Sequence, residues 1–303
     1  MKILFRTWAA VAALALGLTG CGDRPAADAA RPLAVAGVPP VAYIAGRIAG
    51  VPVASALPEG RSPHDFSPSP AIVRDAARAR FFFHTGMPFE QMMLKSLPAA
   101  KALDVTEGIK RIPMEEDCGH EEHGHHHHHH HGHGHDHDAD ALDPHVWLSP
   151  ENCRSIASRI LAALSAADPA KKLEYEANYN KLVGELSEID ARLHETLLPY
   201  KGRTFFVHHP AFGYFAAAYG LKQRGIEMGG REPSPAQLAD VIREAREHGV
   251  KTIFVQKEFN PASSAALAKA IGGATAGLDP LEADVTANFR AIAAALVQGV
   301  GGK

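Results

Sequence analysis

Short apolar runs alternate with amphipathic stretches along most of the chain. The amphipathic stretches carry apolar residues at helical spacing, and the apolar runs between them have the length of buried strands. Parallel strands need helical crossovers of this kind, so the first part of the chain is predicted to form a βαβαβ unit. Its segments are a strand beginning at Leu33, a helix through Val41, Ile44 and Ile48, a strand at 51–57, a helix at 70–79 and a strand at 80–86.

After Gly202 the alternation begins again. Four apolar runs are each followed by a helical pattern, and glycines end several of the helices. The two halves therefore share a β/α plan, although no residue repeat is visible between them. The strands are predicted at 204–209, 221–227, 250–256 and 274–279, and the helices at 210–220, 234–249, 262–273 and 285–299.

The longest periodic stretch lies between these halves. About 27 residues, at about 1.5 Å each, give a helix that is longer than the diameter of a small domain, so we expect it to join two lobes. The predicted fold class is α/β, with two lobes that are each a parallel-sheet β/α sandwich joined by one long rigid helix. The lobes are predicted at 33–165 and 201–303, and the linking helix at 166–200.

The N-terminus has the layout of a secretory signal. Two basic residues precede an apolar run that ends at Leu18, and small residues then lead to Cys21. The ending Leu-Thr-Gly-Cys resembles a bacterial lipobox, which implies cleavage before the cysteine and a lipid on Cys21. An ordinary signal with an incidental cysteine is the alternative. We expect a signal peptide at 1–20, a lipid-anchored tether at 21–32, and a location in the bacterial periplasm or on the cell surface.

The composition limits the classes of partner. The chain has 303 residues, of which 46% are hydrophobic, and a formal net charge of −3. It lacks the basic excess of a phosphate binder, so we predict no nucleic-acid partner. Beyond the N-terminus, no stretch is apolar for the roughly 18 residues that a membrane span needs. We expect a monomer that reaches the membrane through its lipid anchor.

A histidine-rich segment, 117–140, interrupts the first lobe. It has few apolar residues to bury, so we expect a disordered loop of about 20–30 residues. Cys118 and Cys153 bracket the segment, and in an exported protein their even number allows a disulfide between them, with two free thiols as the alternative. The histidines are predicted to give weaker, accessory metal sites, with a solvated spacer as the alternative. They are His120, His123, His125, His126, His127, His128, His129, His130, His131, His133, His135 and His137.

Metal-competent side chains also lie near the ends of the predicted strands. His64 is in a proline-rich loop after a strand, and His145 precedes a helix; His209 and Asp279 each end a strand of the second half. Ligand sites in α/β sheets form where such loops converge. Three imidazoles and one carboxylate suit four-coordinate Zn²⁺, whereas a hard cation would favour more oxygen ligands. A lone loop histidine is usually solvated and Asp before Pro often starts a turn, so the prediction depends on the four occurring together.

Six motifs resemble those of the bacterial ABC-transporter solute-binding lipoproteins for zinc and manganese (cluster A-I), most closely the zinc-uptake type. They are GRSPHDFSPSP, FHTGMPFE, DPHVWLSP, HPAFGYFAAAYGL, REPSPAQLADVI and LDPLEAD. The resemblance covers essentially the whole chain after the leader. It implies Zn²⁺ ligation by His64, His145 and His209, with Asp279 as a candidate fourth ligand.

The resemblance also indicates which of two adjacent histidines is the candidate ligand, and this sequence departs from the family pattern at two positions. Alignment on the segment AFGYF selects His209 over His208, which a strand would turn to the opposite face. Pro210 stands where the family has Asp, and Pro63 stands where some zinc binders have an acidic residue. The fourth ligand is therefore left open between Asp279, water and a histidine of the loop.

Two other side chains are candidates for lesser roles. His84 ends a strand, and we interpret it as a packing residue rather than a ligand. Glu232 lies in a loop of the second half, and we interpret it as an acceptor for the second N–H of a ligating imidazole, because metal-bound histidines usually donate that proton to a carboxylate or carbonyl.

These features predict a receptor that captures Zn²⁺ between two lobes and passes it to the membrane permease of an ABC zinc importer. The alternatives are a Mn²⁺ or Fe²⁺ solute-binding protein of the same family, and a periplasmic zinc buffer or metallochaperone. We expect no enzymatic activity, because the sequence has no His-Glu-x-x-His motif of a zinc hydrolase. Ligation requires neutral imidazole, so zinc affinity is expected to fall as the pH drops through about 6–7.

Overall fold

The computed structural model describes residues 31–114, 142–259 and 262–301. The predicted leader, the lipidation at Cys21, and the histidine-rich segment with Cys118 and the twelve accessory histidines lie outside these ranges. Residues from Pro32 onward form the unit that carries the elements below. No helix within the described ranges combines the length and hydropathy that a membrane crossing requires.

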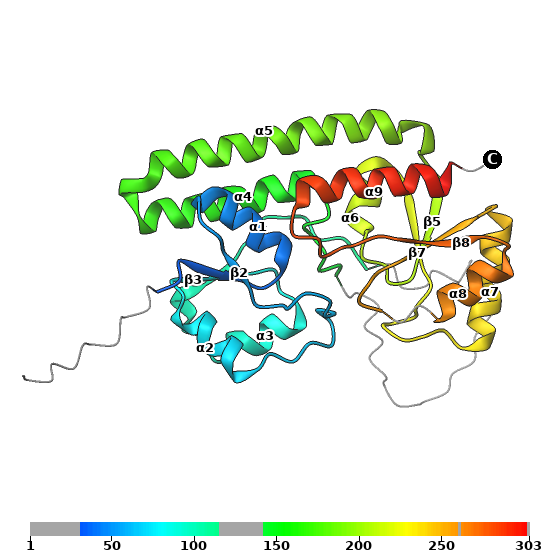
Figure 1. The fold of residues 1–303 in the computed structure, drawn as a ribbon, viewed down its shortest axis with the longest axis horizontal. Helices are drawn as coiled ribbons and strands as arrows, with labels where there is room; N and C mark the ends of the chain where they lie inside the picture. Colours follow the sequence, from blue (N-terminus) through cyan, green and yellow to red (C-terminus); the bar gives the residue numbers. More distant parts are fainter. Residues whose placement is uncertain (1–30, 115–141, 260–261, 302–303) are drawn as a thin grey trace, which may run out of the picture. The chain divides into compact units, whose positions relative to one another are not determined.

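Four parallel strands form the sheet of the N-terminal lobe, in the order β2-β1-β3-β4 (Figure 1). The predicted βαβαβ unit is confirmed. One further helix and one further strand, absent from the sequence-based prediction, follow this unit, and the strand extends the sheet. That strand has three residues, none of them buried, so it lacks the apolar run of a core strand. The elements are β1 (Ala34–Ala36), α1 (Pro39–Ala49), β2 (Ala54–Ser55), α2 (Pro70–Arg78), β3 (Phe81–His84), α3 (Pro88–Leu94) and β4 (Ala102–Asp104).

The C-terminal lobe repeats this arrangement. Its parallel strands lie in the order β6-β5-β7-β8, so in each sheet the first strand is flanked by the second and the third. All eight predicted segments of this lobe are confirmed, with strands shortened by a few residues. The elements are β5 (Thr204–Val207), α6 (Gly213–Tyr219), β6 (Lys222–Gly225), α7 (Pro235–Glu247), β7 (Thr252–Val255), α8 (Ala262–Ala270), β8 (Ala274–Gly277) and α9 (Val285–Val300).

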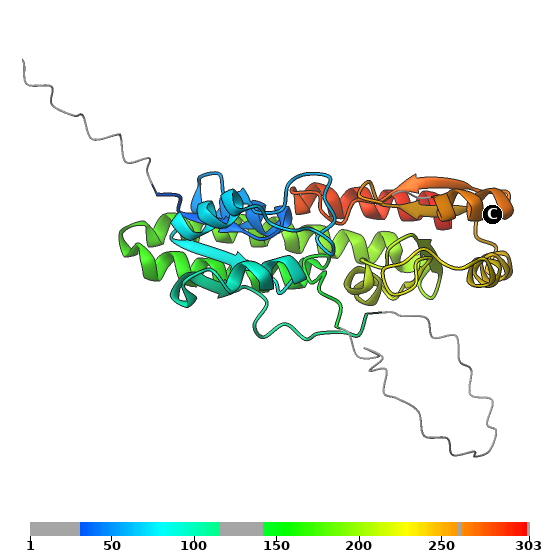
Figure 2. The ribbon, with the colours of Figure 1, turned by 90° about the horizontal axis from the view of Figure 1, so that it is seen from below.

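Helix α4 (Pro150–Ala167) belongs to the first lobe, and α5 (Lys172–Leu197), which follows it, connects the two lobes. The linking helix begins a few residues later than predicted, because α4 continues to Ala167 and Pro169 prevents the two helices from merging. At 26 residues, α5 is about 39 Å long. It packs against α1 and α4 of the first lobe and against α6 and α9 of the second. Figure 1 shows it running along both lobes, and Figure 2 shows the lobes side by side along its direction.

The main apolar core is continuous through these contacts. One cluster of buried side chains includes Ile44 of α1, Leu186 of α5 and Phe289 of α9. A smaller cluster around Phe206 and Ile253 fills the space between the second sheet and its helices α7 and α8. Each fully buried large side chain contributes about 1.5–3 kcal/mol, so a shared core strongly opposes independent rotation of the lobes.

Three helices begin at the same dipeptide, Ser-Pro. Ser69, Ser149 and Ser234 each cap a helix by accepting a hydrogen bond from the backbone N–H three residues later, at 3.4 Å. The proline that follows occupies the first helical position, where its missing N–H and fixed φ cost nothing. Two of these caps stand at the ends of segments that carry histidines of the site below, so the dipeptide fixes where those segments stop.

A buried carboxylate holds the turn after β3. Glu90 Oε2 accepts hydrogen bonds from the backbone N–H groups of Thr85, Gly86 and Met87 at 2.8–2.9 Å. Burial raises the pKa of Glu90 to about 7. A Cβ atom added to Gly37 would lie 1.5 Å from Glu90 Oε1, so only glycine fits there. This packing accounts for the spacing in FHTGMPFE.

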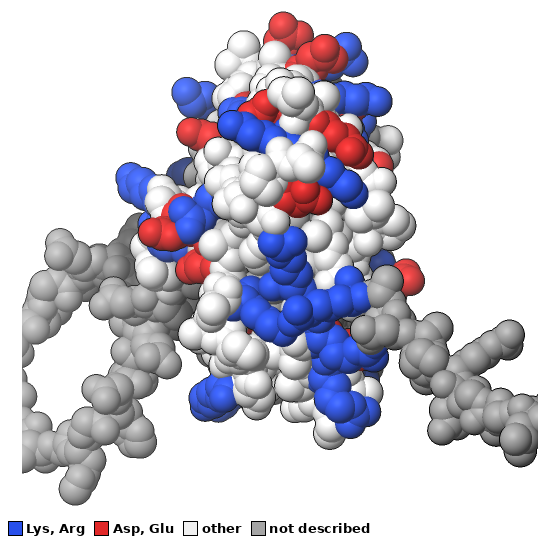
Figure 3. Space-filling view, turned by 90° about the vertical axis from the view of Figure 1, so that its left-hand side faces the viewer, with Lys and Arg blue, Asp and Glu red and all other residues white. Residues whose placement is uncertain are grey.

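Charge is unevenly distributed on one end of the N-terminal lobe. Figure 3 shows Lys and Arg side chains gathered over the lower half of this face, with acidic side chains mostly above them. The net charge of −3 does not reveal this local asymmetry. The absence of a nucleic-acid partner, which was inferred from net charge, stays a prediction.

Candidate metal centre

Three histidines from distant parts of the chain meet between the lobes. His64 lies on the loop between β2 and α2, His145 precedes α4, and His209 follows β5. His64 Nε2 and His145 Nε2 are 3.1 Å apart, and His209 Nε2 and His145 Nε2 are 3.4 Å apart. Among the described residues, these three form the group of side chains whose ligand atoms lie close enough to share an ion, all within 4.8 Å of one another.

The spacing of these nitrogens fits a small divalent ion. A tetrahedral zinc site with Zn–N bonds of about 2.0–2.1 Å places its ligand atoms about 3.3–3.4 Å apart. The two Nε2 distances, 3.1 and 3.4 Å, are close to that value. Three nitrogen donors favour a borderline ion such as Zn²⁺ over Mg²⁺ or Ca²⁺, which prefer oxygen. Together they leave one position of a tetrahedron for a fourth donor.

Each of the three histidines has a proline as its neighbour in sequence. Pro63 precedes His64, Pro144 precedes His145, and Pro210 follows His209. Proline fixes its own φ and restricts the residue before it. All three ligand-bearing segments are therefore stiffened next to the imidazole.

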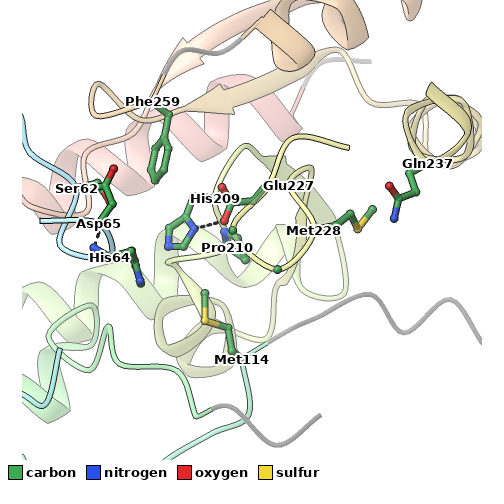
Figure 4. Close-up of a pocket in the computed structure, with 12 residues that line it drawn as sticks. Ser62, His64, Asp65, Met114, His209, Pro210, Glu227, Met228, Gln237 and Phe259 are labelled. Carbon is green, nitrogen blue, oxygen red and sulfur yellow. Dashed lines mark hydrogen bonds and ion pairs between the residues drawn. The ribbon is translucent and has the colours of Figure 1, made fainter. Parts of the chain in front are cut away.

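Two buried carboxylates orient two of the rings. Asp143 Oδ1 lies 2.8 Å from His145 Nδ1 and accepts a second hydrogen bond, also 2.8 Å, from the backbone N–H of His145. Glu227 Oε1 lies 2.5 Å from His209 Nδ1 (Figure 4). A ring that donates its Nδ1 proton to such a carboxylate keeps the lone pair of Nε2 for an ion. Glu227 takes the role that was predicted for Glu232, which is exposed.

Burial favours the neutral form of two of the imidazoles, His64 and His145. It lowers the pKa of His64 to about 2, with His145 and His209 as further causes, and it lowers the pKa of His145 well below the ordinary value. Burial also raises the pKa of Asp143 to about 7. Protonation of His64 and His145 thus begins at a lower pH than the window of about 6–7 expected for a free imidazole. These two rings therefore present lone pairs to an ion throughout the neutral range.

His208 is buried but belongs to a different environment. Its Nδ1 lies 3.0 Å from Ser264 Oγ, at the start of α8. The structure thus brings His209, and not its neighbour, to the other two histidines. His84 is also buried at the end of β3 and is not in the group, as its interpretation as a packing residue requires.

Asp279 is not brought into the group of three histidines. Its Oδ2 lies 2.8 Å from Lys257 Nζ, and its Oδ1 accepts a hydrogen bond of 2.8 Å from the backbone N–H of Leu281. The side chain of Asp279 is 24% exposed. The carboxylate predicted as a candidate fourth ligand therefore has a cation of its own.

Cys153 is a free, fully buried cysteine on α4. Its Sγ donates to the carbonyl oxygen of Trp147 at 3.0 Å, and burial raises the pKa of the thiol. This environment fits the alternative of an inert packing thiol. The predicted partner, Cys118, lies outside the described residues.

An open cavity of about 610 Å³ leads to two of the histidines (Figure 4). His64 and His209 form part of its wall, and Met114 and Met228 line it farther out. Met114 is the last described residue before the predicted histidine-rich segment. An ion arriving from solvent can thus reach His64 and His209 through this cavity.

A family model matches most of the chain. The model described as "Zinc-uptake complex component A periplasmic" matches residues 34–298. This range contains the three clustered histidines and both sheets.

Two curated relatives carry zinc in their names. The "Zinc-binding protein AdcA" of Streptococcus pyogenes is 30% identical over 237 residues, which cover 76% of this chain and 46% of that protein. The chain thus spans about half the length of the streptococcal relative. The "High-affinity zinc uptake system protein ZnuA" of Bacillus subtilis is 33% identical over 241 residues, which cover 75% of this chain and 70% of that protein.

Solved structures share the fold. The crystal structure of ZnuA has a TM-score of 0.76 and 31% identity, covering 88% of this chain and 98% of the other. A ZnuA deletion mutant with zinc bound has a TM-score of 0.77 and 31% identity, covering 89% of this chain and 98% of the other.

Proposed function

Because the chain belongs to the family of periplasmic zinc-uptake complex component A proteins, we propose that it binds Zn²⁺ outside the cytoplasm and delivers it to the membrane permease of an ABC-type importer. In this proposal His64, His145 and His209 ligate the ion through Nε2. The ion is cargo, so binding and release constitute the whole function and no reaction is performed on it.

One observation carries this proposal: three clustered imidazoles, two of them buried, present Nε2 atoms at the spacing of a tetrahedral zinc site. The names of the relatives and of the zinc-bound structure agree with it. A cluster of three nitrogens suits Mn²⁺ or Fe²⁺ less well, because those ions bind mixed oxygen and nitrogen ligands more readily. A lipid on Cys21 would keep the receptor beside its permease, as the name of a "Zinc-binding lipoprotein AdcA" of Streptococcus pneumoniae suggests.

The expected release path follows from the shared core. Since α5 packs against both lobes, we propose that the ion leaves through rearrangement of the histidine-bearing loops and small tilts of the lobes. A wide hinge opening would have to separate buried apolar surface along α5. The permease is therefore expected to act on the loops around the cavity.

Calorimetric titration of the chain without its leader tests the proposal. Zn²⁺ should bind tightly to the wild type and to a control variant, His248→Ala, which changes an exposed histidine at the end of α7. His145→Ala should abolish the tight site, because it removes the nitrogen that lies nearest to both of the others. Retention of tight binding in His145→Ala would reject the assignment of this centre.

A further inference from the structure

A further carboxylate borders the three histidines. Glu258 follows β7, and both of its carboxylate oxygens are buried and lack a hydrogen-bond partner among the described residues. It lines a small cavity of about 10 Å³ together with His64, His145 and His209. The next residue, Phe259, stacks on the His209 ring at a centroid distance of 5.2 Å. The segment that carries Glu258 is thus packed directly against the centre.

An unpaired buried carboxylate is costly. Removing an ionised carboxylate from water costs several kcal/mol unless a cation or hydrogen-bond donors compensate, and native proteins rarely leave such a group unsatisfied. Burial accordingly raises the pKa of Glu258 in the metal-free protein. A group of this kind indicates a partner that arrives from outside the chain.

The other carboxylates near the centre each hold a partner through at least one oxygen, although Asp143 Oδ2 is also buried without a hydrogen bond to any described residue. Asp143 and Glu227 each bind the Nδ1 atom of a histidine. Asp279 is paired with Lys257, the residue immediately before Glu258. Lys257 thus pairs with Asp279, while its neighbour Glu258 lines the small cavity beside the histidines.

We propose that Glu258 is the fourth ligand of the ion, contributing a carboxylate oxygen to the coordination position that His64, His145 and His209 leave open. This inference rests on the proposed function, since it concerns the same ion. It also explains the departures at Pro63 and Pro210, where an acidic residue of the family pattern is absent: the carboxylate comes from the segment after β7. One carboxylate on three neutral imidazoles lowers the charge of the bound Zn²⁺ site from +2 to +1.

Glu258→Gln tests the assignment, because glutamine keeps the shape and removes the charge. Loss of a residue that only hydrogen-bonds to a ligating histidine lowers metal affinity roughly 10–100-fold, so zinc affinity in Glu258→Gln should fall by at least that factor. One binding site per chain should remain. The metal-free variant should unfold at the same or a higher temperature than the wild type, because an uncompensated charge has left the interior. The d–d absorption of bound Co²⁺ should change in position and intensity. Asp279→Asn is the matched control, and it should leave the Co²⁺ spectrum and the zinc affinity unchanged.

The outcomes separate this inference from the function on which it rests. If Glu258→Gln binds Zn²⁺ and Co²⁺ like the wild type while His145→Ala does not bind, the fourth-ligand assignment is overturned and the receptor function stands. If Asp279→Asn, and not Glu258→Gln, weakens binding, Asp279 is the ligand. A Glu258→Gln variant with reduced metal-free stability would show that Glu258 is structural, and Glu258→Asp, which should restore part of the affinity, provides a second check. Tight binding in His145→Ala would instead reject the proposed function.

Discussion

A single oxygen of Asp143 holds both the backbone and the ring of His145. The distances from Asp143 Oδ1 to the backbone nitrogen and to Nδ1 of His145 are both 2.8 Å, and Asp143 itself is buried. The central imidazole of the cluster is therefore fixed in position and in tautomer before any ion is present. An arrangement of this kind makes the ring a stronger ligand, because the carboxylate stabilises the charge that the ion induces on it.

Replacement of Asp143 should weaken zinc binding without removing a ligand. We expect Asp143→Asn to lower the affinity about tenfold, since asparagine can still accept from the ring but carries no charge, and Asp143→Ala to lower it up to about 100-fold. Competition with a chromogenic chelator measures both values. Glu232→Gln is the control, because this exposed carboxylate should have no effect. Equal affinities for Asp143→Ala and the wild type would contradict the role of Asp143.

Trp147 should report zinc binding by fluorescence. The sequence contains two tryptophans, and the other, Trp8, lies in the predicted leader, so Trp147 is the single fluorophore of this type after cleavage. Its ring centroid lies 5.6 Å from that of His145. Zn²⁺ should change the emission at one equivalent, and Co²⁺ should quench it strongly, because Co²⁺ absorbs and accepts energy at short range. His145→Ala should remove both responses, and a full response in that variant would place the ion elsewhere.

Trp147 also links the two halves of the site. Its Nε1 donates to the carbonyl oxygen of Pro280, in the segment after β8, at 2.7 Å. Trp147→Phe would leave a buried carbonyl without its donor, so we expect a loss of about 1–3 kcal/mol in the free energy of unfolding. Urea denaturation of the metal-free protein measures this loss. An unchanged midpoint would show that the hydrogen bond is replaced by water.

The stability of the metal-free protein should depend on pH through Glu90. Its pKa is raised to about 7 in the folded state, above the ordinary value near 4.5, so the folded protein binds the proton more tightly. The contribution of the protonated Glu90 carboxyl group to the free energy of unfolding is complete below about pH 4.5, and it is lost as the pH rises through 7. Between pH 5 and pH 8 the free energy of unfolding should fall less in Glu90→Gln than in the wild type. The difference between the two falls should be about 1–3 kcal/mol. Parallel pH profiles of the two proteins would refute the shift.

Deletion of 117–140 should separate two classes of metal site. The three clustered histidines lie outside this segment, so one tight site should remain, while the total stoichiometry should fall as the accessory histidines are lost. Ordering a flexible segment around an ion costs roughly 1–2 kcal/mol per residue, which keeps such sites weak. Equilibrium dialysis of the full and deleted chains measures both quantities. Loss of the tight site would mean that the histidine-rich segment holds the primary ion.

Periodicity and strand ends were enough to predict most of the fold and to single out the candidate loops, whereas the choice of His209 over His208 needed the family resemblance. Strands such as β5 are unbroken apolar runs bounded by turns, and His209 stands just after that run. The sequence did not predict the α3–β4 unit, because β4 is short and not buried. Its position depends on pairing with β3 rather than on an apolar pattern of its own.

The remaining parts of the site depend on contacts that no sequence pattern displays. Glu227 and Glu232 are equally plausible from sequence, and only the fold shows which of them meets His209. Likewise, nothing in the chain indicates that Lys257 pairs with Asp279 rather than with a residue nearer in sequence. The one local signal that could have been used is Asp143, which stands two residues before His145 in DPH, at the spacing of a side chain that folds back on the backbone N–H.

The prolines beside the three histidines bear on how quickly an ion can be captured. When ligands lie on mobile segments, binding requires those segments to come together first. The ion often dissociates before the last ligand reaches it. Here each imidazole stands next to a residue with restricted backbone, and the three nitrogens already lie within 4.8 Å of one another. We therefore expect the slow step of loading to be the shedding of water by the arriving ion, a property of the metal rather than of the protein.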